Sequence, residues 1–277
     1  MSSFTITGLF KALTFAGLSL ALFPAQATFS PDAPTVLVTG ANRGIGFELA
    51  KQYAEAGWNV IATTRRGEGD PGRAGLEQVQ QGHPNLHIER IDVTSTEMIN
   101  AVADKYRDQP LDVLINNAAA VEATFQADLE QVNQPYNEID FDAARMDFDV
   151  NALGPMRMAQ AFMDHVKRSK QKKIINVTSF IGSFGRGIPT AMGMNYGASK
   201  AALNMYSLKL SHAVKPDGVI VGLVEPILVA SKPGVADNPM AKPVQDEVAK
   251  LRKVIADITM ETSGLITNFS TGEIDPY

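Results

Sequence analysis

Cysteine is absent from the sequence, which excludes disulfide bonds, thiolate metal sites and cysteine nucleophiles. Histidine is also scarce, and none of the four histidines pairs with another at a spacing typical of metal ligands. We therefore expect no metal centre. Positive charge is in the minority, because 25 Lys and Arg residues are outnumbered by 30 Asp and Glu residues, for a net charge of −5. A balance of this sign argues against binding to nucleic acid and against strong binding to membranes.

The apolar stretch at residues 12–23 stands out near the N-terminus. It follows Lys11 and precedes Ala25 and Ala27, which are small residues at the two positions that determine cleavage. This layout is typical of a secretory signal peptide, here at residues 1–27. The stretch of 12 residues is shorter than the roughly 20 that a membrane-spanning helix needs, so we expect cleavage and export, to a periplasm or outside the cell. The alternative is an uncleaved apolar N-terminus on a cytoplasmic or membrane-associated protein.

The remainder of the chain alternates short apolar runs with longer helical patterns, without a Pro/Ser-rich linker or an internal repeat. The predicted strands are residues 35–39, 59–64, 86–90, 111–116, 173–178, 219–224 and 265–269. The predicted helices are residues 45–56, 96–106, 141–168, 196–214 and 244–258. Most strands are continuously apolar, as parallel strands covered on both faces are. The pattern predicts an α/β fold with a single Rossmann-type, doubly wound parallel sheet of about seven strands and helices on both faces. Its ligand should lie at the carboxyl ends of the strands.

A glycine-rich turn connects the first predicted strand to the first predicted helix. Glycine there lets the backbone approach a pyrophosphate, which backbone amides at the positive end of the helix can bind. The glycines follow the pattern G-x-x-x-G-x-G, and a tight turn without a ligand is the alternative. The residues that we expect at the phosphates are Gly40, Asn42, Arg43, Gly44, Ile45 and Gly46.

The end of the second predicted strand distinguishes the two nicotinamide cofactors. An acidic residue there would bind the ribose 2′-hydroxyl of NAD, whereas arginine would accept the 2′-phosphate of NADP. The sequence has Arg65 and Arg66 at this point, and Arg43 in the glycine turn, which favours NADP(H) over NAD(H). The alternative is that Arg65 and Arg66 are solvated loop charges. After the third strand, Asp92 and Val93 are expected beside the adenine, although Asp92 could equally cap the following helix.

Tyr196 and Lys200 are four residues apart in a helical pattern and therefore share one helix face. An ammonium about 4 Å from a phenol is worth about 4 kcal/mol at an effective dielectric near 20, enough to lower a tyrosine pKa of about 10 by up to about three units. The pair could then exchange a proton with a carbonyl or an alcohol. The alternative is a partly buried tyrosine beside a surface lysine. Ser179 follows a predicted strand and could bind a substrate oxygen, and Asn151 lies inside a long predicted helix, where asparagine needs a specific hydrogen-bonding task.

Five elements occur in an order that resembles the short-chain dehydrogenase/reductase family. They are the segment 39–46, Asn116-Asn117-Ala118, Asn151, Ser179 and Tyr196-Gly-Ala-Ser-Lys200. The resemblance covers residues 35–277, and residues 151–155 with the tail 263–272 are similar to its C-factor-like, carbonyl-reductase-type subgroup. It leaves residues 28–34 as a short extension and makes residues 35–277 an NAD(P)-binding catalytic domain.

The resemblance implies hydride transfer between C4 of the nicotinamide and a carbonyl carbon. Tyr196 would then be the acid/base, Ser179 would bind the carbonyl oxygen, and Lys200 would hold the nicotinamide ribose as well as act on Tyr196. Asn151 would anchor a water molecule in a proton relay. Asn117, Pro226 and Ile227 would lie beside the cofactor, and the family also suggests a homo-oligomer.

Two positions depart from the family pattern. Ala119 and Ile227 stand where the family has glycine, beside the nicotinamide half of the cofactor. Together with the predicted export signal, these departures motivate an alternative function, a cofactor-binding signalling or sensor protein with little turnover. A serine hydrolase is disfavoured, because Ser199 would lie inside a helix rather than on a strand-to-helix turn.

The predicted walls of the substrate pocket are residues 181–195 and 227–243. Their apolar side chains include Phe184, Ile188, Met192 and Met194. Such a lining predicts a small apolar ketone or aldehyde, or the corresponding alcohol, as the substrate.

Overall fold

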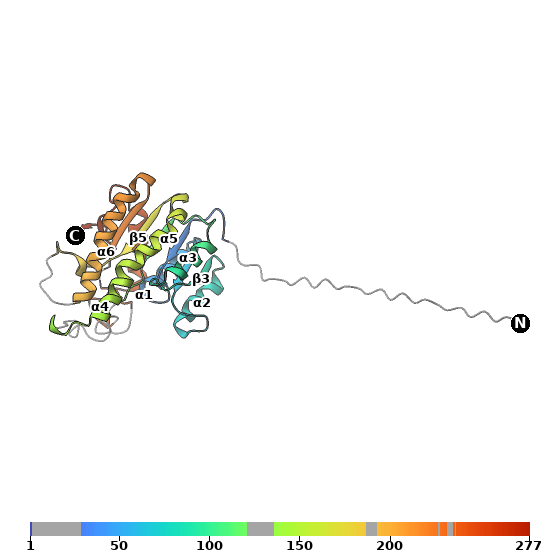
Figure 1. Cartoon of the computed structure of the whole chain (residues 1–277), viewed down its shortest axis with the longest axis horizontal. Helices are drawn as coiled ribbons and strands as arrows, with labels where there is room; N and C mark the ends of the chain where they lie inside the picture. The colour runs from blue at the N-terminus through green and yellow to red at the C-terminus, as the bar shows by residue number, and fades with distance from the viewer. Residues whose placement is uncertain (2–28, 121–135, 187–192, 227, 232–234, 236) are drawn as a thin grey trace.

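One eight-stranded sheet forms the centre of the protein (Figure 1). The computed structural model describes residues 1, 29–120, 136–186, 193–226, 228–231, 235 and 237–277. The strand order is β3-β2-β1-β4-β5-β6-β7-β8. The strands are β1 Thr35–Val38, β2 Asn59–Thr64, β3 Leu86–Arg90, β4 Val113–Asn116, β5 Lys173–Val177, β6 Ile220–Glu225, β7 Ile266–Asn268 and β8 Ile274–Asp275. The first seven pair in parallel, and β8 pairs antiparallel with β7.

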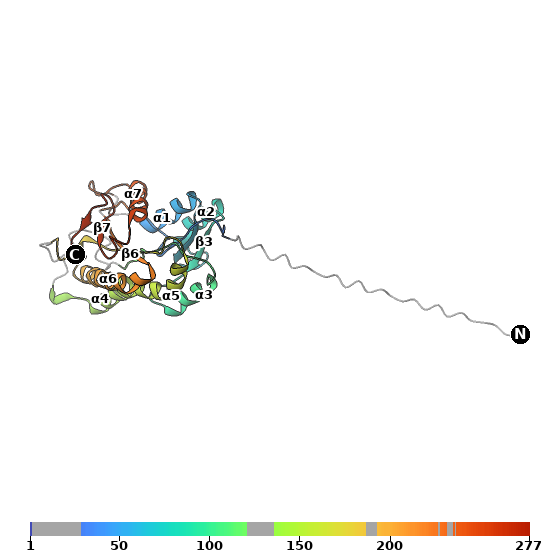
Figure 2. The ribbon, with the colours of Figure 1, turned by 90° about the horizontal axis from the view of Figure 1, so that it is seen from above.

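Helices cover both faces of this sheet. The helices are α1 Gly44–Glu55, α2 Ala74–Gly82, α3 Thr96–Lys105, α4 Phe141–Phe148, α5 Gly154–Arg168, α6 Met194–Val214 and α7 Val244–Asp257. Figure 2 shows α1, α2 and α7 on one side of the strands and α3, α4, α5 and α6 on the other. The predicted fold class is therefore confirmed.

Alternate residues of each strand supply the two halves of the core. On β1, Val36 and Val38 pack toward the layer of α1 and α7, and Leu37 packs toward the layer of α3 and α5. All three side chains are fully buried. Because both faces of the strand are covered, it reads as a continuous apolar run rather than as an alternating one.

The structure differs from the sequence prediction in three elements. The predicted helix 141–168 is divided into α4 and α5 by a π-helical turn at Asp149–Leu153. Helix α2 was not predicted because only Leu76 of its nine residues is buried, so it lacks an apolar stripe. Strand β8 was missed because it has two residues, and one of them, Ile274, is 49% exposed.

The N-terminal extension packs onto the sheet from Phe29 onward. The Phe29 ring stacks on His87 at 4.1 Å between ring centres, and Asn59 Nδ2 donates a hydrogen bond to the Ser30 carbonyl oxygen at 2.8 Å. Apart from Met1, the predicted signal peptide lies outside the described residues. Within the described part of the chain, no helix has both the length and the apolar character needed to cross a membrane.

Candidate active site

The residues predicted to act on a ligand gather at one edge of the sheet. Strands β1, β4, β5 and β6 are parallel neighbours, so their carboxyl ends lie side by side. Gly40 follows β1, Asn117 follows β4, Ser179 follows β5 and Pro226 follows β6. The sheet thus brings together residues that are far apart in the sequence.

The glycine turn is fastened to the end of β4. Asn117 Nδ2 donates to the Thr39 carbonyl oxygen at 2.9 Å, and the Asn117 backbone N–H donates to Thr39 Oγ1 at 2.9 Å. A Cβ atom on Gly46 would lie 2.4 Å from Asn117 Nδ2 and from the Gly40 oxygen, and a Cβ on Gly40 would lie 2.9 Å from Ala118 Cα. Close packing against β4 therefore requires these two glycines. Asn117 holds in place the turn that is predicted to bind the phosphates.

The start of α1 suits an anionic group. Its N-cap residue, Arg43, makes no side-chain hydrogen bond to the helix, and no acidic residue occurs in the first turn. The first backbone N–H groups of a helix have no acceptor within the helix and carry its positive partial charge. The amides of Gly44, Ile45 and Gly46 therefore fit a pyrophosphate, and Asn42 is occupied by a bond from its Nδ2 to the Gly72 oxygen at 3.3 Å.

The arginines beyond β2 have different surroundings. Arg66 Nη1 lies 3.3 Å from Asp70 Oδ2, whereas Arg65 is exposed and its guanidinium has no ion pair within the described residues. Arg65 also acts electrostatically on Asp92. Arg65 and the exposed Arg43 therefore have no carboxylate partner in the described part of the chain, whereas Arg66 has one.

Asp92 forms a turn rather than a helix cap. Its Oδ1 accepts hydrogen bonds from Thr94 N at 3.0 Å and Thr94 Oγ1 at 2.7 Å, and the N-cap of α3 is Ser95. Burial raises the pKa of Asp92, but the two bonds from Thr94 and the charges of Arg65 and Arg90 outweigh burial and hold the pKa below its ordinary value. The Val93 side chain is only 8% exposed. The helix-cap alternative for Asp92 is therefore wrong.

Tyr196, Lys200 and Ser179 meet where β5 ends and α6 begins. Lys200 Nζ donates to the Val177 carbonyl oxygen at 2.8 Å and lies 5.6 Å from the centre of the Tyr196 ring. The Tyr196 hydroxyl forms a side-chain hydrogen bond with Ser179. Tyr196 thus interacts with the predicted carbonyl ligand, and the predicted cation lies beside its ring.

The pKa of Tyr196 shifts in the direction opposite to the sequence prediction. Burial raises the pKa of Tyr196 to about 12, with a further increase from the charge of Asp147 and a decrease from the bond with Ser179. Burial lowers the pKa of Lys200 to about 8, although the charge of Asp147 raises it. Loss of hydration disfavours the charged form of each group and is the largest cause of both shifts.

Asn151 lies in the π-helical turn and connects three parts of the site. Its Oδ1 accepts a hydrogen bond from the Ala120 N–H at 2.8 Å, and its Nδ2 donates to the Ala120 oxygen at 2.8 Å and to Ser199 Oγ at 3.0 Å. These bonds connect the segment after β4 to α6. Asn151 therefore makes specific hydrogen bonds, as expected from its position inside a helix. Ser199 is fully buried in α6, which fits no hydrolase nucleophile.

Asp147 is the residue of this site that the sequence reasoning missed. It lies in α4, one helical turn before Asn151, and is only 2% exposed. Its charge acts on both Tyr196 and Lys200. The sequence could have indicated this residue, because it is an acidic residue four positions before Asn151 and therefore shares a helix face with it.

The nicotinamide and substrate side is described in part. Ile227, Ile188 and Met192 lie outside the described residues. Ala119 is exposed, and Lys172 is the single non-glycine residue with positive φ in the described ranges, so Ala119 carries no left-handed strain. Phe184 is 87% exposed and Met194 begins α6. Phe184 therefore does not pack into an apolar wall as expected.

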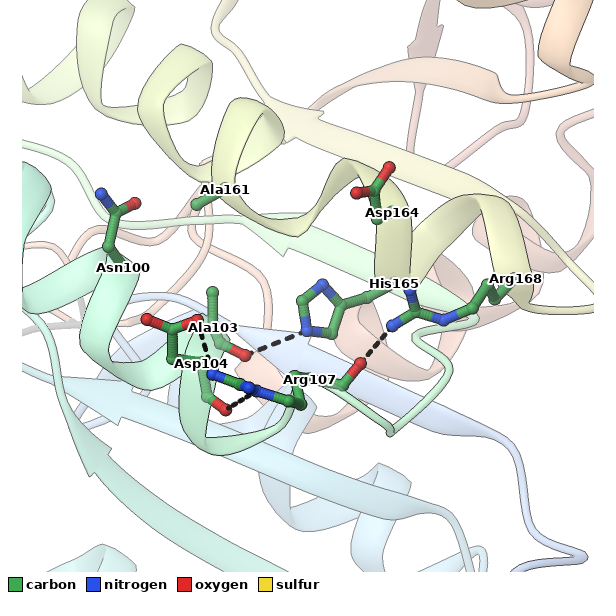
Figure 3. A pocket seen from close by; sticks show the side chains of 8 residues that line it. All are labelled: Asn100, Ala103, Asp104, Arg107, Ala161, Asp164, His165 and Arg168. Atoms are coloured by element: carbon green, nitrogen blue, oxygen red, sulfur yellow. Dashed lines mark hydrogen bonds and ion pairs between the residues drawn. The ribbon is translucent and has the colours of Figure 1, made fainter.

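A hollow of about 390 Å³ lies elsewhere, between α3 and α5 (Figure 3). Its lining residues are Asn100, Ala103, Asp104, Arg107, Ala161, Asp164, His165 and Arg168. His165 Nε2 lies 3.1 Å from the Ala103 oxygen, and Arg168 donates to the Arg107 oxygen. These helix ends precede β4 and β5, so the hollow is near the amino ends of the strands, away from the predicted site.

The sheet has a glycine turn and a helix N-terminus without a side-chain cap, and polar side chains lie along its carboxyl edge. These features define a dinucleotide-binding α/β protein. Comparison of the sequence with known families agrees, because the family model described as short chain dehydrogenase matches residues 34–242. The chain belongs to this family and is an oxidoreductase.

Individual relatives span nearly the whole fold. An uncharacterised oxidoreductase of Schizosaccharomyces pombe is 30% identical over 87% of this chain and 96% of its own length. The 1-hydroxy-2-glutathionyl-2-methyl-3-butene dehydrogenase of Rhodococcus is 32% identical over 83% of this chain and 94% of its own. Among solved structures, NADPH-bound carbonyl reductase from chicken fatty liver is 26% identical, with a TM-score of 0.78 over 88% of this chain and 99% of that chain.

Proposed function

We propose that the protein is an NADP(H)-dependent reductase that interconverts a small apolar ketone or aldehyde and its alcohol. The observation that carries the proposal is the contact of Tyr196 with Ser179 on one side and Lys200 on the other. The similarity to NADPH-bound carbonyl reductase supports the choice of a carbonyl substrate.

In the proposed reaction, the nicotinamide supplies the hydride. The Ser179 and Tyr196 hydroxyls are within hydrogen-bond distance of each other. When a substrate binds, each can turn its proton from this bond toward one carbonyl oxygen, which becomes more negative as reduction proceeds. Tyr196, with a pKa raised to about 12, is protonated at neutral pH and can give its proton to that oxygen. Lys200, held by the Val177 carbonyl, keeps positive charge close to the resulting phenolate.

The cofactor preference is proposed from charge. The amides at the start of α1 would hold the pyrophosphate, and Arg65 and Arg43 would contact the 2′-phosphate. Substitution of Arg65 by Ala should weaken NADPH binding by roughly 10-fold, as expected for loss of a charged hydrogen bond, and should leave NADH binding nearly unchanged. The matched control is Arg66→Ala, because Arg66 is already paired with Asp70.

The experiment that tests the proposed function is NADPH oxidation by the purified protein with a panel of apolar ketones and aldehydes. Turnover that requires NADPH supports the proposal. Tight NADPH binding without turnover across the panel would instead favour the signalling or sensor alternative. Failure to bind either cofactor would contradict both functions.

The cellular location is proposed from the sequence, as export after cleavage of residues 1–27. An exported enzyme would need a source of NADP(H) outside the cytoplasm. The cellular location and the cofactor preference therefore need separate measurements.

A further inference from the structure

The segment between β5 and α6 connects two of the proposed catalytic residues. Ser179 stands at its start, and Tyr196 is the third residue of the helix that follows it. The first described part of this segment, residues 180–186, ends at Arg186. The segment thus links the residues that carry the two hydroxyl groups of the proposed site.

Arg186 binds two carboxylates from different parts of the sheet. Its Nη2 lies 2.8 Å from Glu225 Oε1 and 2.6 Å from Asp275 Oδ1. Glu225 is the last residue of β6, immediately before Pro226, and Asp275 belongs to β8. One guanidinium nitrogen thus joins the segment after Ser179, the strand that leads to the proposed nicotinamide loop, and the C-terminal strand.

These ion pairs are more buried than pairs on the surface. The side chains of Glu225 and Asp275 are 3% and 15% exposed, and that of Arg186 is 33% exposed. Salt and water screen such pairs much less than they screen exposed ones. The Arg186 ion pairs therefore hold their segments in place more firmly than the surface pair of Arg145 and Asp142 does. The side chains of that pair are 75% and 93% exposed.

Neighbouring contacts attach the same segment to the C-terminal strand. Ser183 Oγ donates to the Pro276 oxygen at 2.7 Å, and the Gly185 N–H donates to the Tyr277 oxygen. A Cβ atom on Gly185 would lie 2.5 Å from Pro276 Cβ. The two backbones are therefore in close contact next to the Arg186 ion pairs.

The ion pairs of Glu225 and Asp275 both depend on the positive charge of Arg186. Two carboxylates face one guanidinium, and Glu225 Oε2 and Asp275 Oδ2 are buried with no hydrogen-bond partner among the described residues. Burial raises the pKa of Glu225 to about 7 even with Arg186 beside it. Without Arg186, Glu225 would take up a proton and Asp275 would lose its cation, so the ion pairs that join β6, β8 and the segment that carries Ser183 and Gly185 would be lost.

We propose that Arg186 is a positioning residue, which holds the segment after Ser179 against β6 and β8 and so fixes the substrate side of the active site. The proposal rests on the proposed function for its effect on turnover. It also predicts a structural effect that can be measured without turnover.

The first test is hydrogen exchange of the intact protein, wild type and Arg186→Met. We expect faster exchange of backbone amides in both residues 180–186 and residues 274–277, and unchanged exchange in α1. Arg145→Met serves as the matched control, since it removes an exposed arginine with one carboxylate partner. Exchange that stays as in the wild type in both segments would overturn the proposal, whether or not the enzyme turns over the ketone panel.

The second test separates positioning from general loss of structure. In Arg186→Met we expect kcat/KM for the carbonyl to fall roughly 10- to 100-fold, mainly through KM, as for a misplaced substrate. NADPH binding should stay within about twofold. Arg186→Lys, which restores a cation, should recover part of the loss. An equal loss in the lysine and methionine variants, or a fall in kcat alone, would contradict the proposal.

If Arg186→Met fails to fold, Asp275→Asn is the alternative variant. It removes one of the two ion pairs and should give the same change in hydrogen exchange in a milder form.

Discussion

Lys200 points its ammonium at the carbonyl oxygen of Val177, with 2.8 Å between Nζ and oxygen. The end of β5 therefore holds the lysine in place, and the lysine in turn lies 5.6 Å from the centre of the Tyr196 ring. A buried ammonium fixed by a strand end is a rigid source of positive field for a neighbouring phenol.

Removal of the Tyr196 hydroxyl should abolish turnover while leaving cofactor binding within a few-fold. In Tyr196→Phe the proton donor is gone and the ring remains, so we expect kcat to fall by roughly 100-fold or more. The measurement is NADPH oxidation beside NADPH binding by fluorescence. The control is Tyr206→Phe, on the same helix but 42% exposed. A variant that kept wild-type kcat would rule out Tyr196 as the acid.

Substitution of Asp147 by Asn should lower the pKa of both Tyr196 and Lys200. The carboxylate raises both pKa values in the wild type, because negative charge disfavours the phenolate and favours the ammonium. Alcohol oxidation, which needs an unprotonated Tyr196, should therefore reach its maximum at a lower pH. The measurements are the pH profile of oxidation and an NMR titration of the Lys200 side chain. Asp142→Asn, exposed on the same helix, should change neither.

Glu225 should make the protein less stable as the pH rises toward neutrality. Burial raises the pKa of Glu225 from 4.5 to about 7, helped by Asp275 and opposed by Arg186. A raised pKa means that the folded protein binds the proton more tightly than the unfolded chain. The resulting stability is present below about pH 4.5 and is lost by about pH 7, with a total change of roughly 3 kcal/mol.

Urea denaturation at pH 5 and pH 8 measures this effect. In Glu225→Gln the difference in the free energy of unfolding between the two pH values should be smaller than in the wild type by part of that amount. Glu55→Gln, which removes an exposed carboxylate, is the control and should leave the difference unchanged. An identical pH dependence in the Glu225 variant would contradict the prediction.

A methyl group at Gly46 should destabilise the turn before α1. The added Cβ would meet Asn117 Nδ2 and the Gly40 oxygen at 2.4 Å, so one of these groups must move. We expect Gly46→Ala to lower the free energy of unfolding by about 1–3 kcal/mol and to weaken cofactor binding. Gly67→Ala is the control, because no atom lies within 4 Å of a Cβ built there. Equal stability of the two variants would show that the turn is not packed as described.

N-terminal sequencing of the native protein should give a first residue of Thr28. Cleavage after Ala27 is expected because small residues occupy Ala25 and Ala27 after an apolar stretch. A mature protein that starts at Met1 or Ser2 would refute cleavage and leave the cytoplasmic or membrane-associated alternative.

Local patterns in the sequence determined the fold class and the positions of most predicted site residues. Continuous apolar runs predicted seven of the eight strands, because a strand covered on both faces has no polar side, as Val36 and Leu37 show. The glycine turn and the Tyr196–Lys200 spacing are local as well, and the structure places them at the same edge of the sheet. The roles of these residues in binding and catalysis stay predictions.

Only the tertiary structure decided the electrostatics of the site and the contacts of its substrate side. The sign of the Tyr196 and Lys200 pKa shifts depends on burial and on Asp147, and neither follows from a four-residue spacing. The joining of Arg186 to Glu225 and Asp275 depends on strands that lie far apart in the chain. A sequence pattern reports periodicity within one element, whereas loss of hydration and charge contact arise only when separate elements pack together.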